Sequence, residues 1–226
     1  NQAVTKGLNP NAPMKDSGID LLGEIPEHWE TSKIGFLAFV TKLTGFEYTK
    51  LWKSDRQGDI IALRGFNIGE RELKLDNIEY IDQNLAKSLE RSTLCKNDLV
   101  VPCTGTLGNA AVISKDDTYH INQNIAKIRI KRKLLPEFLC YWLTSDLCRK
   151  KIEKNNVSAM QPVLLIGDIR QLKLPIPPPD EQQKNIIFLD KKVKSVNEVK
   201  TKICKQIDKL TELKQILIAE AVTGKI

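Results

Sequence analysis

The sequence has few of the residues that build metal sites and disulfide frameworks. Its 226 residues include only two histidines, His28 and His120, and five cysteines at wide spacings without a C-x-x-C pair. Structural zinc sites usually use four such ligands in closely spaced pairs, so we expect no metal site. An odd number of scattered cysteines also predicts free, mostly structural thiols and a reducing, cytoplasmic location.

The sequence also lacks several signals of catalysis and of membrane insertion. It has no Walker loop, no dinucleotide fingerprint, and no apolar run near the roughly 18 residues that a membrane span needs. No charged and then apolar signal sequence precedes residue 30. Neither histidine lies in a nucleophile motif, and the pair Asp116–Asp117 falls in an expected turn. A nuclease or methyltransferase in its own right is therefore the weakest hypothesis, although scattered nuclease carboxylates leave it open.

Positive charge is in excess. The 35 Lys and Arg residues outnumber the 28 Asp and Glu residues, which gives a formal net charge of +7 and a pI near 9.1. Such a surplus favours a polyanionic partner, with nucleic acid first and an anionic membrane surface second. Hydrophobic residues make up 41% of the chain, as in ordinary globular proteins.

A long helix is predicted at the C-terminal end. A proline-rich turn over 174–179 precedes Asp180, which is suited to a helix N-terminus, and no Pro or Gly occurs between Ile186 and Gly224. About 40 helical residues would span roughly 60 Å, which indicates a role in assembly. Its apolar residues follow the three-four alternation of a coiled coil. The seam comprises Ile186, Leu189, Val193, Val196, Ile203, Ile207, Leu210 and Leu217.

Lys200 and Lys214 interrupt this seam, and charges at such positions can fix register or partner. We expect the helix to pair with a second helix, and a homodimer is the simplest case. The alternative left open is an ordinary amphipathic helix that packs on its own domain.

The remaining chain divides into two further parts. Residues 1–30 form an irregular arm that Trp29 is expected to dock onto a core, and residues 31–173 form a mainly β, α+β domain. Residues 174–226 contain the turn and the long helix. Short apolar runs predict strands, among them 60–63, 99–101 and 125–130, and one helix is expected over about 136–154.

Polar residues in and beside glycine-flanked loops are the candidates for ligand contact. Arg pairs with guanine and Asn or Gln with adenine, while Thr and Lys position phosphates. The alternative is that these are ordinary turns whose polar groups cap their own backbone. The candidate residues are Arg64, Asn67, Thr104, Thr106, Asn122, Gln123, Lys127 and Arg129.

Five motifs carry a resemblance to a known family. They are Gly23–Trp29, Asn97–Val101 with Thr104–Thr106, Asn122–Ala126, Leu174–Gln182 and Ala221–Ile226. Together they resemble the DNA specificity (S) subunit of type I restriction-modification systems. Such subunits usually contain two target-recognition domains, each followed by a helix, so one domain and one helix resemble a half subunit or an excised half.

The resemblance implies a mechanism. The domain would grip one half of a bipartite double-stranded DNA target, and the helix would act as a ruler to a second recognition domain. Two identical copies would read an interrupted palindrome. The family implies partners: methyltransferase subunits that use S-adenosylmethionine, and restriction subunits that use ATP and Mg²⁺. The chain itself would hold no cofactor and supply no catalysis. A coiled-coil scaffold with incidental basic charge is the second hypothesis.

Overall fold

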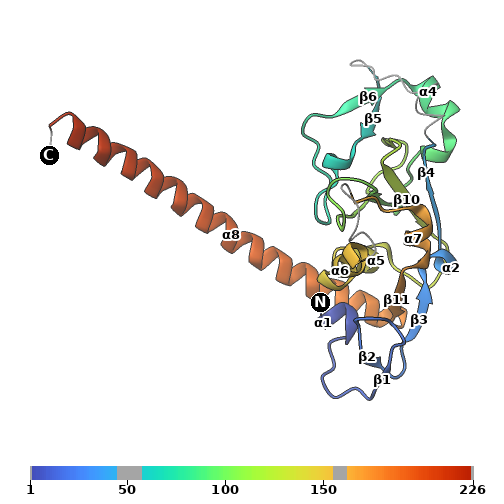
Figure 1. The fold of residues 1–226 in the computed structure, drawn as a ribbon. Helices are drawn as coiled ribbons and strands as arrows, with labels where there is room; N and C mark the ends of the chain where they lie inside the picture. The colour runs from blue at the N-terminus through green and yellow to red at the C-terminus, as the bar shows by residue number, and fades with distance from the viewer. Residues whose placement is uncertain (1, 45–57, 155–161, 225–226) are drawn as a thin grey trace. The chain divides into compact units, whose positions relative to one another are not determined.

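The computed structural model describes residues 2–44, 58–154 and 162–224 (Figure 1). Contacts group the chain into two units, Asn1–Ile186 and Ile187–Ile226, called here the globular unit and the distal helix. The predicted division after residues 30 and 173 stays a prediction. The contacts place the N-terminal arm within the globular unit.

Two small antiparallel pairs form one end of the globular unit (Figure 1). They are β1 (Met14–Asp16) with β2 (Glu24–Pro26), and β3 (Glu30–Lys33) with β11 (Lys173–Ile176). Trp29 is fully buried, as predicted. Its ring packs against Gly7, which follows helix α1 (Gln2–Thr5) and has a φ of +73°. A Cβ on Gly7 would lie 3.0 Å from the indole, so close packing and backbone conformation both favour glycine.

Two larger sheets build the centre of the globular unit. The antiparallel sheet has the order β4–β10–β7–β8, and the mixed sheet has the order β6–β5–β9 with β5 and β9 parallel. The strands are β4 (Ala38–Lys42), β5 (Ile60–Leu63), β6 (Glu79–Ile81), β7 (Leu99–Pro102), β8 (Ala111–Val112), β9 (Tyr119–Ile121) and β10 (Ile125–Ile130). Leu63 of β5, Val100 of β7 and Ile125 of β10 share one apolar core, which fixes one sheet on the other.

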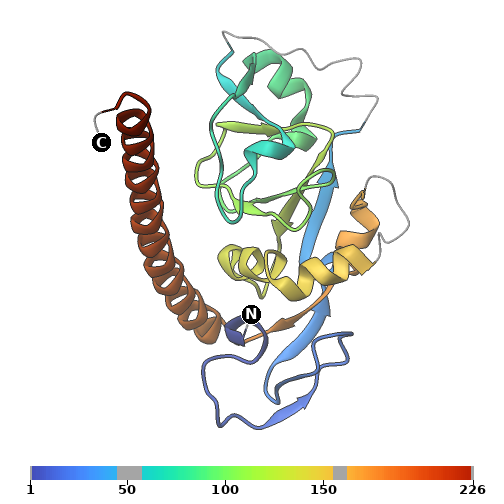
Figure 2. The same ribbon diagram turned by 60° about the vertical axis from the view of Figure 1, so that its left-hand side comes forward.

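Short helices cover and connect these sheets. They are α2 (Ile34–Leu37), η1 (Gly65–Asn67), α4 (Gln83–Ser88), η2 (Glu90–Ser92) and α7 (Ile166–Gln171). Helices α5 (Pro136–Leu143) and α6 (Asp146–Lys154) lie between the β3–β11 pair and the region of β5 (Figure 2).

The single helix expected over 136–154 is broken, because two hydroxyl side chains end one helix and start the next. Thr144 Oγ1 donates to the Cys140 carbonyl at 2.9 Å, and Ser145 Oγ donates to the Trp142 carbonyl at 2.6 Å. Ser145 Oγ also accepts from the Cys148 N–H at 3.3 Å, as a capping residue does.

Helix α8 (Pro179–Val222) has 44 residues and confirms the predicted long C-terminal helix. Its first turns belong to the globular unit. Gln182 is fully buried, accepts from the Leu135 N–H, and donates to the Lys133 and Pro177 carbonyls. The α+β organisation expected from the sequence, a mainly β body followed by a long helix, is therefore confirmed. Among the helices of the described ranges, none combines the length and the apolar character of a membrane span.

Candidate nucleic-acid interface

Three polar loops meet at the ends of strands β5, β7 and β9. The Asn122 N–H donates to the Leu63 carbonyl at 3.2 Å, and the Cys103 N–H donates to the Asn124 carbonyl at 2.7 Å. A Cβ on Gly65 would lie 3.7 Å from the Thr104 carbonyl oxygen. Segments 64–69, 103–109 and 122–124 are therefore neighbours, and we call them the loop cluster. Predicted contact residues occur in all three segments, but the sequence did not predict that the segments meet.

Among the predicted contacts in the second and third segments, Thr104, Thr106 and Gln123 are accessible. Thr106 is exposed, and Thr104 and Gln123 are half-buried. Gly105 has a φ of +78° and accepts a tight-turn hydrogen bond from the Leu107 N–H at 2.9 Å. This left-handed backbone favours glycine, and it lies between the half-buried Thr104 and the exposed Thr106. Hydroxyls presented in this way suit phosphate or base contacts.

Asn67 and Asn122 lie in the loop cluster but are buried. Asn67 is fully buried, accepts from the Arg64 N–H at 3.0 Å, and donates to the Lys74 and Asp76 carbonyls at 2.9 and 3.1 Å. Asn122 is 8% exposed and accepts from the Asn124 N–H at 2.9 Å. These bonds shape the loops, and base contact by either amide stays a prediction.

Arg64 lies at the edge of the loop cluster and is held by three neighbours. Its Nη1 donates to Glu79 at 2.6 Å and its Nη2 donates to the Asn77 carbonyl at 3.1 Å. The guanidinium carbon lies 4.4 Å from the ring centroid of Phe66. Both terminal nitrogens of Arg64 thus already bond within the protein. Base contact by Arg64 likewise stays a prediction.

Lys127 and Arg129 lie apart from the loop cluster, along β10. Ile125 pairs with Pro102 beside the loops, whereas Ile128 pairs with Leu99 at the opposite end of β7, so residues 127–129 run away from the loops. Lys127 is 4% exposed and donates to the Thr93 carbonyl at 2.9 Å, and burial lowers its pKa. The structure therefore does not bring these two predicted contacts together with the others.

Arg129 binds a buried carboxylate. Its Nε and Nη2 donate to Asp98 at 2.7 and 2.6 Å, and Asp98 is 1% exposed. The hydrogen bond from Arg129 to Asp98 raises the pKa of Arg129. Asp98 also accepts from the Cys95 N–H at 2.9 Å. The pair therefore joins β10 to the start of β7, and its role in DNA contact stays a prediction.

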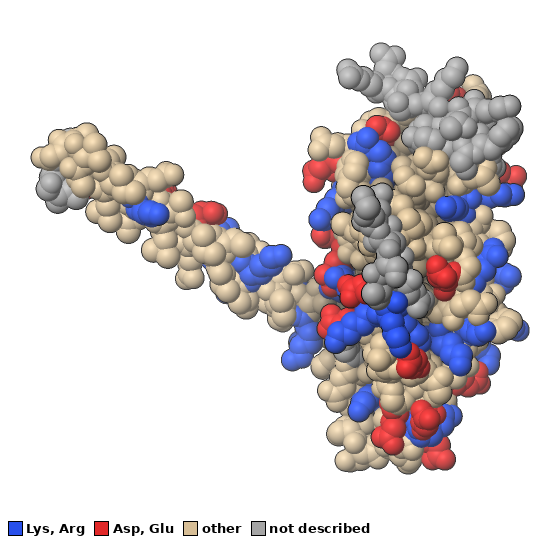
Figure 3. Space-filling view, in the orientation of Figure 1, with Lys and Arg blue, Asp and Glu red and all other residues tan. Residues whose placement is uncertain are grey.

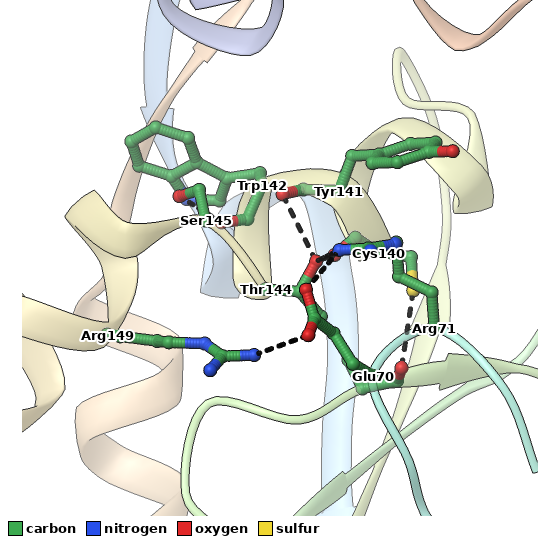
Figure 4. A network of polar contacts seen from close by, with 9 residues as sticks. Glu70, Arg71, Cys140, Tyr141, Trp142, Thr144, Ser145 and Arg149 are labelled. Atoms are coloured by element: carbon green, nitrogen blue, oxygen red, sulfur yellow. Dashed lines mark hydrogen bonds and ion pairs between the residues drawn. The ribbon is translucent and has the colours of Figure 1, made fainter. Parts of the chain in front are cut away.

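A polar network that the sequence did not suggest braces the loop cluster against helices α5 and α6 (Figure 4). Oε1 of Glu70 accepts a hydrogen bond from Nη1 of Arg71 at 2.6 Å, and its Oε2 lies 3.6 Å from Nη2 of Arg149. Arg71 also donates to Thr144 Oγ1 at 3.2 Å and lies over the ring of Tyr141. A Cβ on Gly108 would lie 2.6 Å from Cγ of Arg149, so Arg149 directly supports the 103–109 segment.

Charges are mixed on one face of the globular unit. On the face drawn in Figure 3, Lys and Arg side chains lie among Asp and Glu side chains over the globular unit. A mixed surface is suited to guided positioning rather than to indiscriminate attraction of polyanions. Across 2–44, 58–154 and 162–224, no group of three or more His, Cys, Asp or Glu side chains is placed to hold a metal ion.

The predicted helix seam is mostly exposed. Ile186 is buried in the globular unit, and Leu189 and Val193 are half-buried. Exposed seam residues on the distal helix are Val196, Ile203, Ile207, Leu210 and Leu217. Pairing through this seam stays a prediction.

Two further apolar residues, 14 positions or two heptads apart, lie beside the seam. Val199 and Leu213 are exposed and immediately precede Lys200 and Lys214, the two interrupting lysines. An exposed apolar side chain thus lies beside the seam next to each lysine, although neither was among the predicted seam residues.

Comparisons with known proteins agree on one family. Residues 26–209 match the family model described as the type I restriction modification DNA specificity domain. The chain is 20% identical over 203 residues to the Escherichia coli type I restriction enzyme EcoBI specificity subunit, covering 89% of this chain and 43% of that protein. It is 24% identical over 228 residues to the MjaVIII specificity subunit of Methanocaldococcus jannaschii, covering 98% and 51%.

Solved structures share the fold. One from a study of complex assembly and conformational transition of the type I R-M system has a TM-score of 0.66 at 17% identity, covering 92% of this chain and 48% of that chain. The HsdS subunit of Thermoanaerobacter tengcongensis has a TM-score of 0.53 at 15% identity, covering 83% and 42%. The chain thus spans about half the length of the relatives that it matches.

Proposed function

This chain belongs to the family of type I restriction-modification DNA specificity domains, and from that premise we propose that its loop cluster binds one part of a DNA target. The observation that carries the proposal is the convergence of three polar segments at the ends of β5, β7 and β9. Accessible hydroxyl and amide groups from Thr104, Thr106 and Gln123 lie together there, where a duplex could meet them at once.

The distal helix would supply the second half of the function. Exposed apolar side chains along the helix gain free energy when a partner helix covers them. Because the chain spans about half of its relatives' length, that partner is either a second copy or the remaining half of a longer subunit. Two recognition units held by paired helices would read a bipartite target, and two identical units an interrupted palindrome.

The chemistry would belong to other subunits. In this proposal the chain supplies specificity, methyltransferase subunits bring S-adenosylmethionine, and a restriction subunit brings ATP and Mg²⁺. The family assignment supports this division of roles.

A selection experiment tests the proposal. The full chain, alone and with its methyltransferase partner, is incubated with a randomised duplex library, and the bound fraction is sequenced. We expect an enriched motif in two blocks, with affinity falling steeply as salt rises because phosphate contacts release counterions. A single enriched block would mean recognition without pairing. No enrichment with the partner present would reject recognition in favour of the coiled-coil scaffold.

A matched pair of variants locates the contact. Thr106→Val removes an exposed hydroxyl from the loop cluster with little change in volume, and we expect weaker binding to the enriched duplex. Thr31→Val makes the same change at an exposed position on β3, outside the loop cluster, and should leave binding unchanged. Equal losses from both variants would contradict the assignment of the interface.

A further inference from the structure

An exposed aromatic ring stands among the polar residues of the loop cluster. Phe66 lies in η1, directly after β5, and its side chain is 51% exposed. The guanidinium of Arg64 lies over one face of its ring, with the guanidinium carbon 4.4 Å from the ring centroid. With Arg64 on that face, about half of the surface of Phe66 is still accessible to a ligand.

The protein holds this ring in place through a chain of buried and partly buried contacts. Arg64 is fixed by Glu79 and by the Asn77 carbonyl, and the fully buried Asn67 fixes the backbone on either side of Phe66. Ordering a side chain on binding costs free energy, and here folding has already met that cost. A rigid, exposed phenyl ring beside hydroxyl groups is therefore suited to recognition.

The position of Arg64 over one face of the Phe66 ring limits the kinds of DNA contact that the ring can make. An aromatic ring that inserts fully between two base pairs stacks on a base at each face, and the guanidinium of Arg64 occupies one face of Phe66. A single apolar face suits a single apolar group in a polar groove. The only such group on a base edge in the major groove is the C5-methyl of thymine, which distinguishes it from the other bases.

We propose that Phe66 contacts the C5-methyl group of a thymine in the target and that Arg64 is the positioning residue that holds the ring. The inference rests on the proposed function and names one specificity contact within it. Phe66 was not among the residues singled out from the sequence. An aromatic residue in the glycine-containing turn Arg64–Asn67 was the signal that could have identified it.

Replacing thymine by uracil tests the contact without changing the protein. Uracil pairs with adenine in the same way and lacks only the methyl group. The enriched duplex from the selection is made with each thymine replaced by uracil in turn, and binding to the full chain is measured. Burying one methyl contributes about 0.8 kcal/mol, so we expect a roughly 4-fold loss of affinity at one position.

Three variants assign that loss to the ring. Phe66→Ala should bind the thymine and uracil duplexes equally, and Arg64→Ala should reduce the thymine-to-uracil ratio because the ring is no longer held. Phe36→Ala removes a phenylalanine that is 68% exposed on α2, outside the loop cluster, and should keep the ratio.

The outcomes separate this inference from the proposed function. Uracil tolerated at every position, a target without thymine, or a ratio unchanged by Phe66→Ala would each overturn the thymine contact while leaving DNA recognition intact. Absence of any enriched duplex would instead reject the proposed function.

Discussion

The indole N–H of Trp29 donates a hydrogen bond to Oε2 of Glu181 at 2.9 Å, joining residues that are 152 positions apart. The other carboxylate oxygen lies 2.6 Å from Nε2 of His28. Glu181 is in the first turn of α8, and Trp29 is fully buried at the end of the N-terminal arm. One carboxylate therefore fixes the arm to the start of the long helix.

This contact predicts an energetic coupling between the two residues. Trp29→Phe keeps most of the apolar ring and removes the donor, and Glu181→Gln removes the charge that strengthens the bond. We expect a coupling free energy of about 1–2 kcal/mol in a double-mutant cycle measured by denaturant unfolding. Pairing Trp29→Phe with Glu198→Gln on the distal helix should give additive changes, and coupling of similar size there would contradict the assignment.

Asn67→Ala is predicted to destabilise the globular unit. The substitution leaves the Lys74 and Asp76 carbonyls and the Arg64 N–H without the partner that each has now. We expect the free energy of unfolding to fall by about 2–4 kcal/mol, measured by chemical denaturation. Thr106→Ala, at an exposed position in the same loop cluster, should change it by less than about 0.5 kcal/mol. A small effect of Asn67→Ala would mean that these bonds do not shape the loops.

His120 predicts a dependence of stability on acid. Its side chain is fully buried, and burial lowers the pKa to about 4 from the usual 6.5. Between these two pH values the unfolded chain binds more protons than the folded chain, so stability falls as pH drops through that window. The resulting loss in the free energy of unfolding reaches about 3 kcal/mol near pH 4, and it is absent above pH 6.5.

Unfolding measured from pH 7.5 down to pH 4 checks this expectation. His120→Gln removes the titrating group, so its profile should be flatter over the window even if the variant is less stable throughout. Identical slopes for the two proteins would exclude His120 as the cause.

The seam of the distal helix predicts the oligomeric state. Ile203→Glu with Ile207→Glu places charges at two exposed apolar positions, and a pairing that buries these positions should fail. Light scattering should then report monomers where the unchanged chain is dimeric. Lys202→Glu with Lys205→Glu introduces the same acidic residues on the other side of the helix and should preserve pairing. An unchanged mass for the isoleucine variant would exclude the seam as an interface.

Predictions from sequence succeeded where structure is set locally. The stretch without Pro or Gly after residue 179 predicted α8, because each helical hydrogen bond joins residues only four apart. Alternation of apolar residues likewise predicted β10 over Ile125–Ile130. The helix over 136–154 was predicted as continuous, because its apolar face continues across Thr144 and Ser145, whose hydroxyl groups break it.

The partners of the candidate polar residues depend on contacts between residues that are distant in the sequence. Residue type alone placed Arg64, Asn67, Lys127 and Arg129 in one group of candidates, but only the fold assigns them partners. Arg129 binds Asp98, 31 positions away, and Lys127 binds the Thr93 carbonyl, 34 positions away.

Local order along the chain was enough to predict the long helix, the main strands and the resemblance of the motifs, because each depends on neighbours within a few residues. Tertiary structure alone brought segments 64–69, 103–109 and 122–124 together, and it alone decided which of their side chains face outward. Each polar group is satisfied by whichever partner the packed core brings near it, and a side chain that this packing buries no longer faces solvent.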